Sequence, residues 1–274
     1  MKKLKVLAGL SLLLVSMFSL AGCGENEIKT ATEIKDLVAT YESNIENVDF
    51  SKFTLTYKYS NKCEYNHDSI DDIDEFREFT ISYDESGYLY YKNQELENTY
   101  SEVWLYIDET NLILASNNYK NSLETKNYDI LEFNSYEAAH ESFLEEAPKR
   151  LNNFADWFNY QYNSIYDIPN KYCLDYYKTA SNLCERVINE LDPYIKVNTN
   201  DGTILDIGFS AGERYVFENG ILKSYNDSYS GTRKFDQYGV GTVTETYESS
   251  TYINLLMSCE LNKPDLSTFN KIYH

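Results

Sequence analysis

Hydrophobic and polar residues alternate most regularly over residues 53–60. The apolar or aromatic positions are Phe53, Leu55, Tyr57 and Tyr59, and the residues between them are Thr54, Thr56, Lys58 and Ser60. A period of two over eight residues predicts a β-strand with one buried face. We therefore expect the four apolar or aromatic side chains to lie together on the buried face of a sheet.

Shorter alternating segments predict further strands in both halves of the chain. In the first half they fall at residues 79–83, 88–91, 103–107 and 112–114, with a turn at Ser86 and Gly87 after the first of them. In the second half they fall at residues 195–197, 205–209 and 215–217 and from residue 221 onward, with turns at 201–202 and 219–220. Each half thus predicts an antiparallel meander.

Apolar residues three or four positions apart predict helices in the remaining segments. They recur in this way at residues 31–47, at residues 136–163 and at residues 171–191. The middle segment contains Pro148, and proline is tolerated in the first turn of a helix but not in its interior. We therefore expect one helix to end near Ala147 and another to start at Pro148.

These elements predict an α+β fold, a curved antiparallel sheet shaped like a half-barrel and packed against several helices. We expect a single domain over residues 31–274. The alternative is two halves, each a helix followed by a meander, at residues 31–134 and 135–274. The 27 tyrosines among 274 residues fit this fold, because tyrosine packs well on half-buried strands.

The N-terminus has the pattern of an export signal. Lys2, Lys3 and Lys5 precede an apolar run over residues 6–20. A membrane-spanning helix needs about 20 predominantly apolar residues, so this shorter run predicts a signal peptide over residues 1–22 that is removed.

The signal ends in Leu20, Ala21, Gly22 and Cys23, a sequence that resembles the lipobox of bacterial lipoproteins. The resemblance implies cleavage before Cys23, which then carries a diacylglyceryl thioether and an N-acyl group such as palmitate. Two or more acyl chains anchor a protein stably. The expected location is the bacterial cell membrane, facing outside the cytoplasm, with residues 23–30 as the lipidated cysteine and a short tether.

The net charge excludes one class of partner. The whole chain has a formal charge of −20; removing the three lysines of residues 1–22 from the 24 basic residues leaves 21 against 44 acidic residues, which is −23. Such a charge repels nucleic-acid phosphates and anionic lipid headgroups. We therefore expect no nucleic acid as a partner, and we expect attachment to the membrane through the lipid anchor alone.

Four cysteines remain in the mature chain: Cys63, Cys173, Cys184 and Cys259. In the helix predicted at residues 171–191, Cys173 and Cys184 lie about 16 Å apart, beyond the roughly 7 Å that a disulfide allows between α-carbons. One or two bridges would therefore join them to Cys63 or Cys259. The alternative is that these cysteines are buried, unpaired thiols.

No motif in the chain predicts a reaction centre. His67, His140 and His274 are far apart and lack the paired spacing of zinc hydrolases, and nucleophile-elbow, phosphate-loop and dinucleotide motifs are absent from the sequence. We predict a protein without catalysis and without a metal or other cofactor.

One acidic cluster is a candidate cation site. It comprises Asp68, Asp71, Asp72, Asp74 and Glu75, beside His67. Calcium prefers six to eight oxygen ligands, but this spacing lacks the alternating oxygens and central glycine of an EF-hand loop. A solvated hairpin loop is the favoured interpretation.

The order of the predicted elements resembles the LolA and LprG type of lipoprotein carrier. The opening helix leads through Asp49 and Phe50 into the strand at residues 53–60, followed by a meander, a helical insertion and more hairpins. The resemblance implies a half-open barrel that binds a lipid or another hydrophobic ligand between sheet and helices, facing Phe53, Leu55, Tyr57 and Tyr59. The alternative is a structural or protein-interaction lipoprotein with a filled core, no small-molecule ligand and an envelope protein as partner.

Overall fold

The computed structural model describes most of the region predicted to fold. The described residues are 32–33, 35–36, 39, 45–96, 98–157, 168–174, 176–178, 194–197, 204–208, 212–218 and 221–272. The predicted signal peptide at residues 1–22 and the lipidated tether at residues 23–30 lie outside them.

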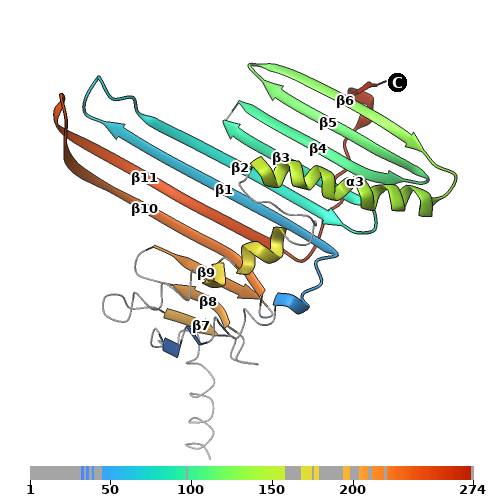
Figure 1. Cartoon of the computed structure of the whole chain (residues 1–274), viewed down its shortest axis with the longest axis horizontal. Coiled ribbons are helices and arrows are strands. Elements are labelled where there is room, and N and C mark those ends of the chain that lie inside the picture. Colours follow the sequence, from blue (N-terminus) through green and yellow to red (C-terminus); the bar gives the residue numbers. More distant parts are fainter. Residues whose placement is uncertain are drawn as a thin grey trace, which may run out of the picture.

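Twelve strands of the described residues form one open sheet (Figure 1). They are β1 (Lys52–Tyr65), β2 (Ile73–Asp84), β3 (Tyr88–Leu96), β4 (Thr99–Asp108), β5 (Asn111–Lys120), β6 (Leu123–Glu132), β7 (Tyr194–Val197), β8 (Ile204–Gly208), β9 (Arg214–Glu218), β10 (Ile221–Gln237), β11 (Gly241–Leu256) and β12 (Asn270–Lys271). Their order across the sheet is β12-β6-β5-β4-β3-β2-β1-β11-β10-β9-β8-β7. All pairs are antiparallel except β12 with β6. This confirms the predicted α+β class.

Strand β1 joins the two meanders. Tyr57 of β1 pairs with Phe79 of β2 on one side and with Ile253 of β11 on the other. Strands from residues 31–134 and from residues 135–274 therefore belong to one sheet. The division of the chain into domains stays a prediction.

The helix α3 (Tyr136–Trp157) runs without a break through Pro148, so the predicted division at Ala147 and Pro148 is wrong. Proline lacks the N–H that would bond to the carbonyl four residues earlier, and here that carbonyl belongs to Leu144, an exposed residue. Solvent-side carbonyls of a helix can tilt toward water, which accounts for the tolerance. Ser135 Oγ accepts from Ala138 N at 3.3 Å and caps the helix start.

Other helical residues agree with the predictions as far as they are described. Residues 168–174 and 176–178 are helical; we call them the second helical segment. The later part of the helix predicted at residues 171–191 lies outside the described residues. Within the helix predicted at residues 31–47, residues 32–33, 35–36 and 39 are helical, and η1 (Ile45–Asn47) is a 3-10 turn.

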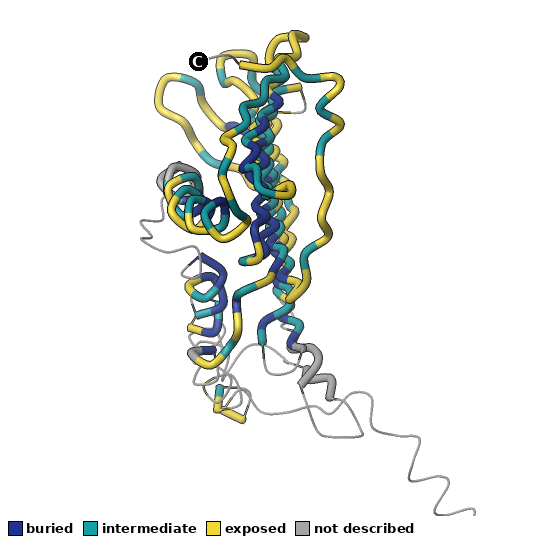
Figure 2. Tube along the Cα trace, turned by 90° about the vertical axis from the view of Figure 1, so that its right-hand side faces the viewer, coloured by how far each residue is buried: buried dark blue, intermediate teal, exposed yellow. Residues whose placement is uncertain are grey.

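The main core lies between one face of the sheet and the helices (Figure 2). The sheet contributes Phe53, Leu55, Phe79, Ile81 and Tyr83, α3 contributes Phe143, Ala147 and Leu151, and the second helical segment contributes Tyr172 and Tyr177. The rings of Phe143 and Tyr83 stack with centroids 6.1 Å apart. Burying a side chain of this size stabilises the fold by about 1.5–3 kcal/mol, so this layer holds the helices on the sheet.

The C-terminal segment, residues 257–272, covers the opposite face of the sheet (Figure 2). The carbonyl of Asn262 accepts from Tyr88 Oη and Trp104 Nε1, both at 3.1 Å, and Asn262 N donates to Tyr88 Oη at 3.0 Å. Beyond the 3-10 turn η2 (Leu266–Thr268), β12 pairs with β6. Phe269 packs edge-on against Trp104, with ring centroids 6.1 Å apart. The segment thereby buries a second apolar cluster.

Four strands project beyond their neighbours. The pairing of β2 with β3 ends at Glu78 and Gln94, and that of β10 with β9 ends at Asn226 and Arg214. Beyond these pairs β1, β2, β10 and β11 continue together; we call residues 58–65, 73–77, 227–237 and 241–251 the wing. In the view of Figure 1, no helix of the described residues crosses the wing.

Candidate functional site

The predicted ligand-facing residues lie on one face of β1, the face toward the helices. Phe53 and Leu55 are 0% and 1% exposed and belong to the packed core. Tyr57 is half-buried at the border of the core, where its ring stacks on Phe79 with centroids 5.0 Å apart. Tyr59 is half-buried and already lies on the wing. Around Phe53 and Leu55, protein side chains therefore fill the interior.

The cysteines are distributed over distant parts of the fold. Cys63, Cys173 and Cys259 are free thiols in the structure, and Cys184 lies outside the described residues. Burial raises the pKa of Cys173 to about 12 and that of Cys259 to about 11. Cys23, the predicted lipidation site, also lies outside the described residues.

The acidic cluster spans the hairpin loop and the strand after it: Asp68, Asp71 and Asp72 lie in the loop between β1 and β2, as favoured above, whereas Asp74 and Glu75 lie on β2. Asp68, Asp71, Asp72, Asp74 and Glu75 are all exposed. Asp72 Oδ1 accepts from Tyr65 N at 2.8 Å, and His67 Nδ1 lies 2.8 Å from Ser69 Oγ. These contacts shape the loop locally. No group of three or more His, Cys, Asp or Glu side chains among the described residues is placed to hold a metal ion.

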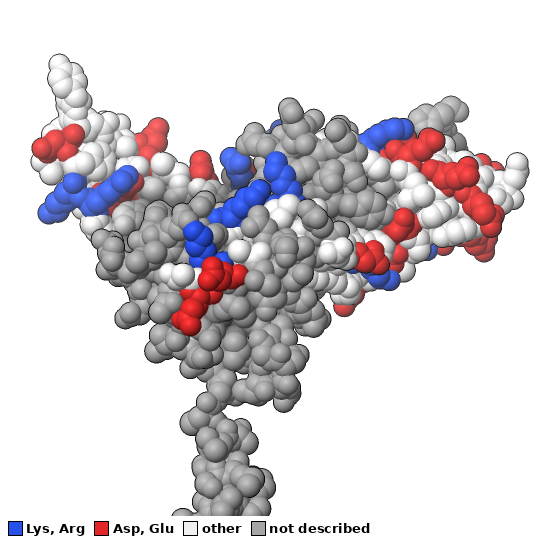
Figure 3. All heavy atoms as spheres, turned by 60° about the horizontal axis from the view of Figure 1, so that its bottom comes forward, with Lys and Arg blue, Asp and Glu red and all other residues white. Residues whose placement is uncertain are grey.

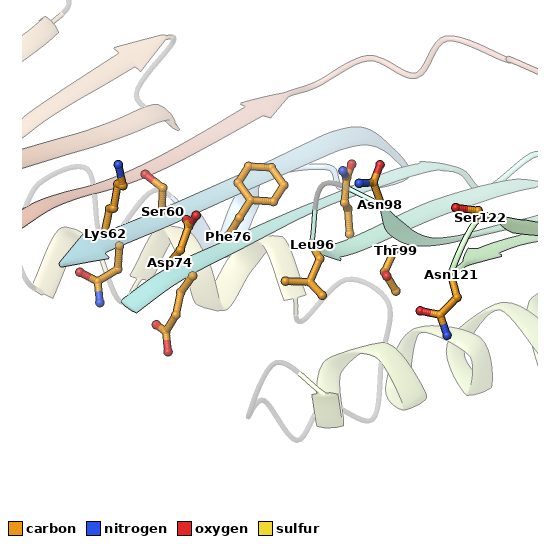
Figure 4. Close-up of a pocket in the computed structure, with 12 residues that line it drawn as sticks. Ser60, Lys62, Asp74, Phe76, Leu96, Asn98, Thr99, Asn121 and Ser122 are labelled. Carbon is orange, nitrogen blue, oxygen red and sulfur yellow. The ribbon is translucent and has the colours of Figure 1, made fainter. Parts of the chain in front are cut away.

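A notch in the sheet lies where β2 and β3 separate beyond the Glu78–Gln94 pair (Figure 4). Its volume is about 800 Å³, and an adjoining hollow of about 500 Å³ lies against the edge of β2. The notch is lined by Ser60, Asn61, Lys62, Asp74, Glu75, Phe76, Gln94, Leu96, Asn98, Thr99, Asn121 and Ser122. It opens between the wing and the ends of the β3–β4 and β5–β6 hairpins.

The edge of β2 along the notch presents backbone hydrogen-bonding groups. Glu85 N donates to Ser51 O on the side of β1, at 2.8 Å. In an antiparallel strand, the N–H and C=O of one residue point to the same side, and those of the next residue point to the opposite side. Since Glu85 bonds toward β1, the odd-numbered residues of β2 bond toward β1 and the even-numbered residues face β3. The backbone groups of Asp74 and Phe76 therefore face the notch, where the register with β3 has ended. This free edge, residues 73–77, is about 16 Å long.

Side chains around the free edge offer both apolar and charged contacts. Leu96 is 56% exposed, and Phe76 is half-exposed. Figure 4 shows Lys62 and Phe76 on the side of the sheet away from the helices, and Leu96 on the helix side. Lys62 pairs with Glu64 at 2.7 Å. An occupant of the notch would thus meet apolar side chains on both faces of the sheet.

Charge is distributed unevenly over the molecule. Figure 3 shows acidic side chains gathered toward the end that carries β6 and the start of α3. Within the sheet, a polar network links Tyr90 Oη to Glu102 Oε1 at 3.0 Å and Asn117 Nδ2 to both Glu102 and Glu124. This network stands on the face away from the helices, beside the apolar cluster under the C-terminal segment, and gives that part of the sheet a fixed polar surface.

The pattern of the sequence does not single out the notch residues. Asp74 and Glu75 were considered only as members of an acidic loop, and Phe76, Leu96 and Asn121 were not considered. Phe76 could have been noticed from the sequence: it is an aromatic residue, whereas Asp74 and Glu78, two positions away on the same face of a strand, are charged. The notch itself arises where a ladder ends, which alternation within one strand does not encode.

Comparisons with known proteins give only weak structural similarity. No protein family model matches the chain, and no curated protein matches it. An outer membrane lipoprotein-sorting protein domain from Vibrio parahaemolyticus is 8% identical over 85% of this chain and 96% of that chain, with a TM-score of 0.21. A DUF1329 family protein from Desulfovibrio piger is 10% identical over 85% of this chain and 95% of that chain, with a TM-score of 0.22.

Similarity of this degree assigns neither a family nor a ligand to the chain. Among the described helices, none has the length and hydropathy that a membrane crossing requires.

Proposed function

We propose that this protein is a non-enzymatic binding module of the bacterial cell envelope that holds an extended segment of a partner protein in the notch. The observation that carries the proposal is the free edge of β2 at residues 73–77, which borders a hollow of about 800 Å³. The partner segment adds as a strand and bonds to the backbone of Asp74 and Phe76.

The lining of the notch supports a peptide as the occupant. Backbone groups of an edge strand are satisfied best by another strand about 4.8 Å away. Phe76 and Leu96, on opposite faces of the sheet, would contact alternate side chains of the added strand. The filled core around Phe53 and Leu55 leaves no comparable space between sheet and helices at that place.

Selection from a random linear peptide library displayed on phage, against the immobilised protein, tests the proposal. Asp74→Pro removes an N–H that faces the notch and leaves the bonds to β1 intact, and proline is tolerated on a strand edge. Asp74→Asn keeps the N–H and removes the charge, so it is the matched control. Selected peptides should bind the wild type and Asp74→Asn but lose binding to Asp74→Pro; equal binding to all three proteins would refute strand addition.

We also propose that a lipid on Cys23 attaches the protein to the membrane. The lipobox resemblance at residues 20–23 supports it. Metabolic labelling with an alkyne analogue of palmitate should label the wild type and not Cys23→Ala. If Cys23→Ala stays equally labelled and membrane-bound, the protein has another anchor.

A hydrophobic ligand between sheet and helices is the second candidate function. It is supported by half-buried aromatic rings at the border of the main core, at Tyr57, Tyr91 and Tyr176. Native mass spectrometry of the purified protein, followed by organic extraction, separates the two functions. A stoichiometric lipid favours this second candidate, whereas a clean apo mass that persists after incubation with membrane lipids favours the notch.

A further inference from the structure

One face of the wing carries a group of partly exposed tyrosines. The odd-numbered residues of its strands share the face toward the helix side, because the registers of β1, β2, β10 and β11 pair odd with odd throughout the wing. Tyr59, Tyr229 and Tyr247 lie on this tyrosine face, and Tyr229 is 39% exposed. From strand spacing and rise, the three positions cover a strip roughly 14 Å long.

The outer part of the Tyr247 ring lies over Gly231 of the neighbouring strand. A Cβ atom at residue 231 would be 2.7 Å from Tyr247 Oη and 3.0 Å from Cζ. Only a residue without a side chain leaves room for this ring position. The ring is half-exposed and occupies the space over Gly231 that a side chain there would fill.

Hydrogen-bonding groups stand between these rings. Asn61 and Ser249 pair with each other across β1 and β11, and Tyr229 pairs with Ser249 from β10. Asp227 accepts from Thr251 N at 2.7 Å and from Tyr225 Oη at 2.9 Å. These neutral and carboxylate oxygens and the amide lie within reach of a ligand resting on the rings.

The charges of the tyrosine face nearly cancel. Arg233 is paired with Glu245, and Arg77 lies two residues from Glu75 on the same strand. Two acids remain, and both are occupied by hydrogen bonds within the protein: the carboxylate of Asp227 accepts two, and Glu213 Oε1, beside this face, accepts from Tyr229 Oη at 2.8 Å. A face of this kind has little attraction for a charged polymer and suits an uncharged ligand rich in hydroxyl groups.

We propose that the tyrosine face binds a neutral polysaccharide chain. A pyranose ring whose substituents are equatorial has an apolar C–H face, which stacks on the electron-rich face of a tyrosine, while its hydroxyls bond to groups such as Asn61 and Ser249. The length of the strip fits several consecutive sugar rings. Asn61 also lines the notch, but the rings of the tyrosine face do not, so sugar binding does not depend on the free edge of β2 or on the proposed function.

The opposite face of the sheet provides a control for the tyrosine face. Its even-numbered positions include Lys58, Ser60, Lys62, Ser228, Ser230 and Glu248. One residue beyond the wing on β11, Tyr252 lies on this same face and is 37% exposed. Tyr252 and Tyr247 lie on the same strand and differ in the face they occupy. Tyr252→Ala therefore removes a similarly exposed ring without touching the proposed site.

Calorimetric titration with cellohexaose and chitohexaose, two uncharged β-linked hexasaccharides, tests the proposal. The wild type should bind at least one of them, and Tyr247→Ala should weaken binding about five- to tenfold. Gly231→Val should do the same, since valine suits a strand but displaces the Tyr247 ring. Tyr252→Ala and Asp74→Pro should bind like the wild type.

Three results would overturn the proposal: no binding of either hexasaccharide to the wild type, equal weakening by Tyr252→Ala, or unchanged binding in Tyr247→Ala. Thermal unfolding of each variant checks that the fold persists. If Gly231→Val does not fold, Tyr247→Ala and Tyr229→Ala decide the outcome on their own. Loss of peptide selection in Asp74→Pro with retained sugar binding would show that the two sites fail independently.

Discussion

The guanidinium of Arg233 on β10 donates to the carboxylate of Glu245 on β11. Glu245 is only 2% exposed. Tyr65 Oη donates to the same carboxylate from β1, at 3.1 Å. The hydrogen bond from Arg233 outweighs the effect of burial and lowers the pKa of Glu245. Three strands of the wing are thus tied together by one ionised group.

Because the folded-state pKa of Glu245 is lowered, its stabilisation is fully present above the unfolded-state pKa of about 4.3 and is lost as pH falls through the folded value. We expect the free energy of unfolding of the wild type to fall more steeply between pH of about 5 and 3 than that of Glu245→Gln. Urea unfolding across this range measures both slopes. Glu248→Gln, an exposed residue on the same strand, should keep the wild-type slope; identical slopes for all three proteins would contradict the account.

Truncating a side chain of the main core should lower the stability of the protein as it does in a tightly packed interior. Phe143 is 0% exposed and stacks on Tyr83, so Phe143→Ala should lower the free energy of unfolding by about 3–5 kcal/mol. Leu131, which is 47% exposed, is the control, and Leu131→Ala should change stability by less than about 0.5 kcal/mol. Denaturant titration measures both variants. A small effect of Phe143→Ala would mean that this layer is loosely filled.

The contact between Tyr88 and Asn262 should hold the C-terminal segment on the sheet. Tyr88→Phe removes a hydroxyl that both donates to Asn262 O and accepts from Asn262 N. We expect a loss of about 1 kcal/mol in stability and faster hydrogen exchange at the Asn262 amide. Tyr106→Phe keeps the ring that Lys263 approaches to 4.9 Å and is the matched control. Unchanged exchange at Asn262 in Tyr88→Phe would show that the segment is held elsewhere.

The sequence predicts most of this fold, because strands with one buried face show their burial in the alternation of residues. Phe53 and Leu55 are core residues as expected, and the turn at Gly87 has the positive φ of 118° that glycine allows. Pro148 misleads, since a carbonyl on the solvent side of α3 relieves the cost that proline imposes in a buried helix.

The wing and the notch were beyond prediction from the sequence. Strand β11 carries hydroxyl and charged residues on both faces where it crosses the wing, so its burial pattern does not reveal its partner. Its pairing with β1 joins residues such as Tyr59 and Thr251, far apart in the chain. The notch depends on the points where β3 and β9 stop, which are set by register rather than by local composition.

The thiols should differ in reactivity. Burial raises the pKa of Cys63 and raises that of Cys173 to about 12, so neither thiol should react with iodoacetamide at neutral pH before unfolding. Cys259 is less buried and should react first. Mass spectrometry of alkylated peptides, with and without prior reduction, measures this order. If a cysteine is alkylated only after reduction, it takes part in a disulfide. That result would support one of the bridges predicted from the sequence, such as one that involves Cys184.

The measurement that tests strand addition most directly is residue-resolved hydrogen exchange with and without a selected peptide. We predict that exchange at the amides of Asp74 and Phe76 slows about tenfold or more at peptide concentrations well above Kd. The amides of Ile73 and Glu75, which already bond toward β1, should change far less. Protection at Phe53 and Leu55, or no protection at Asp74 and Phe76 despite binding, would contradict the assignment of the notch as the binding site.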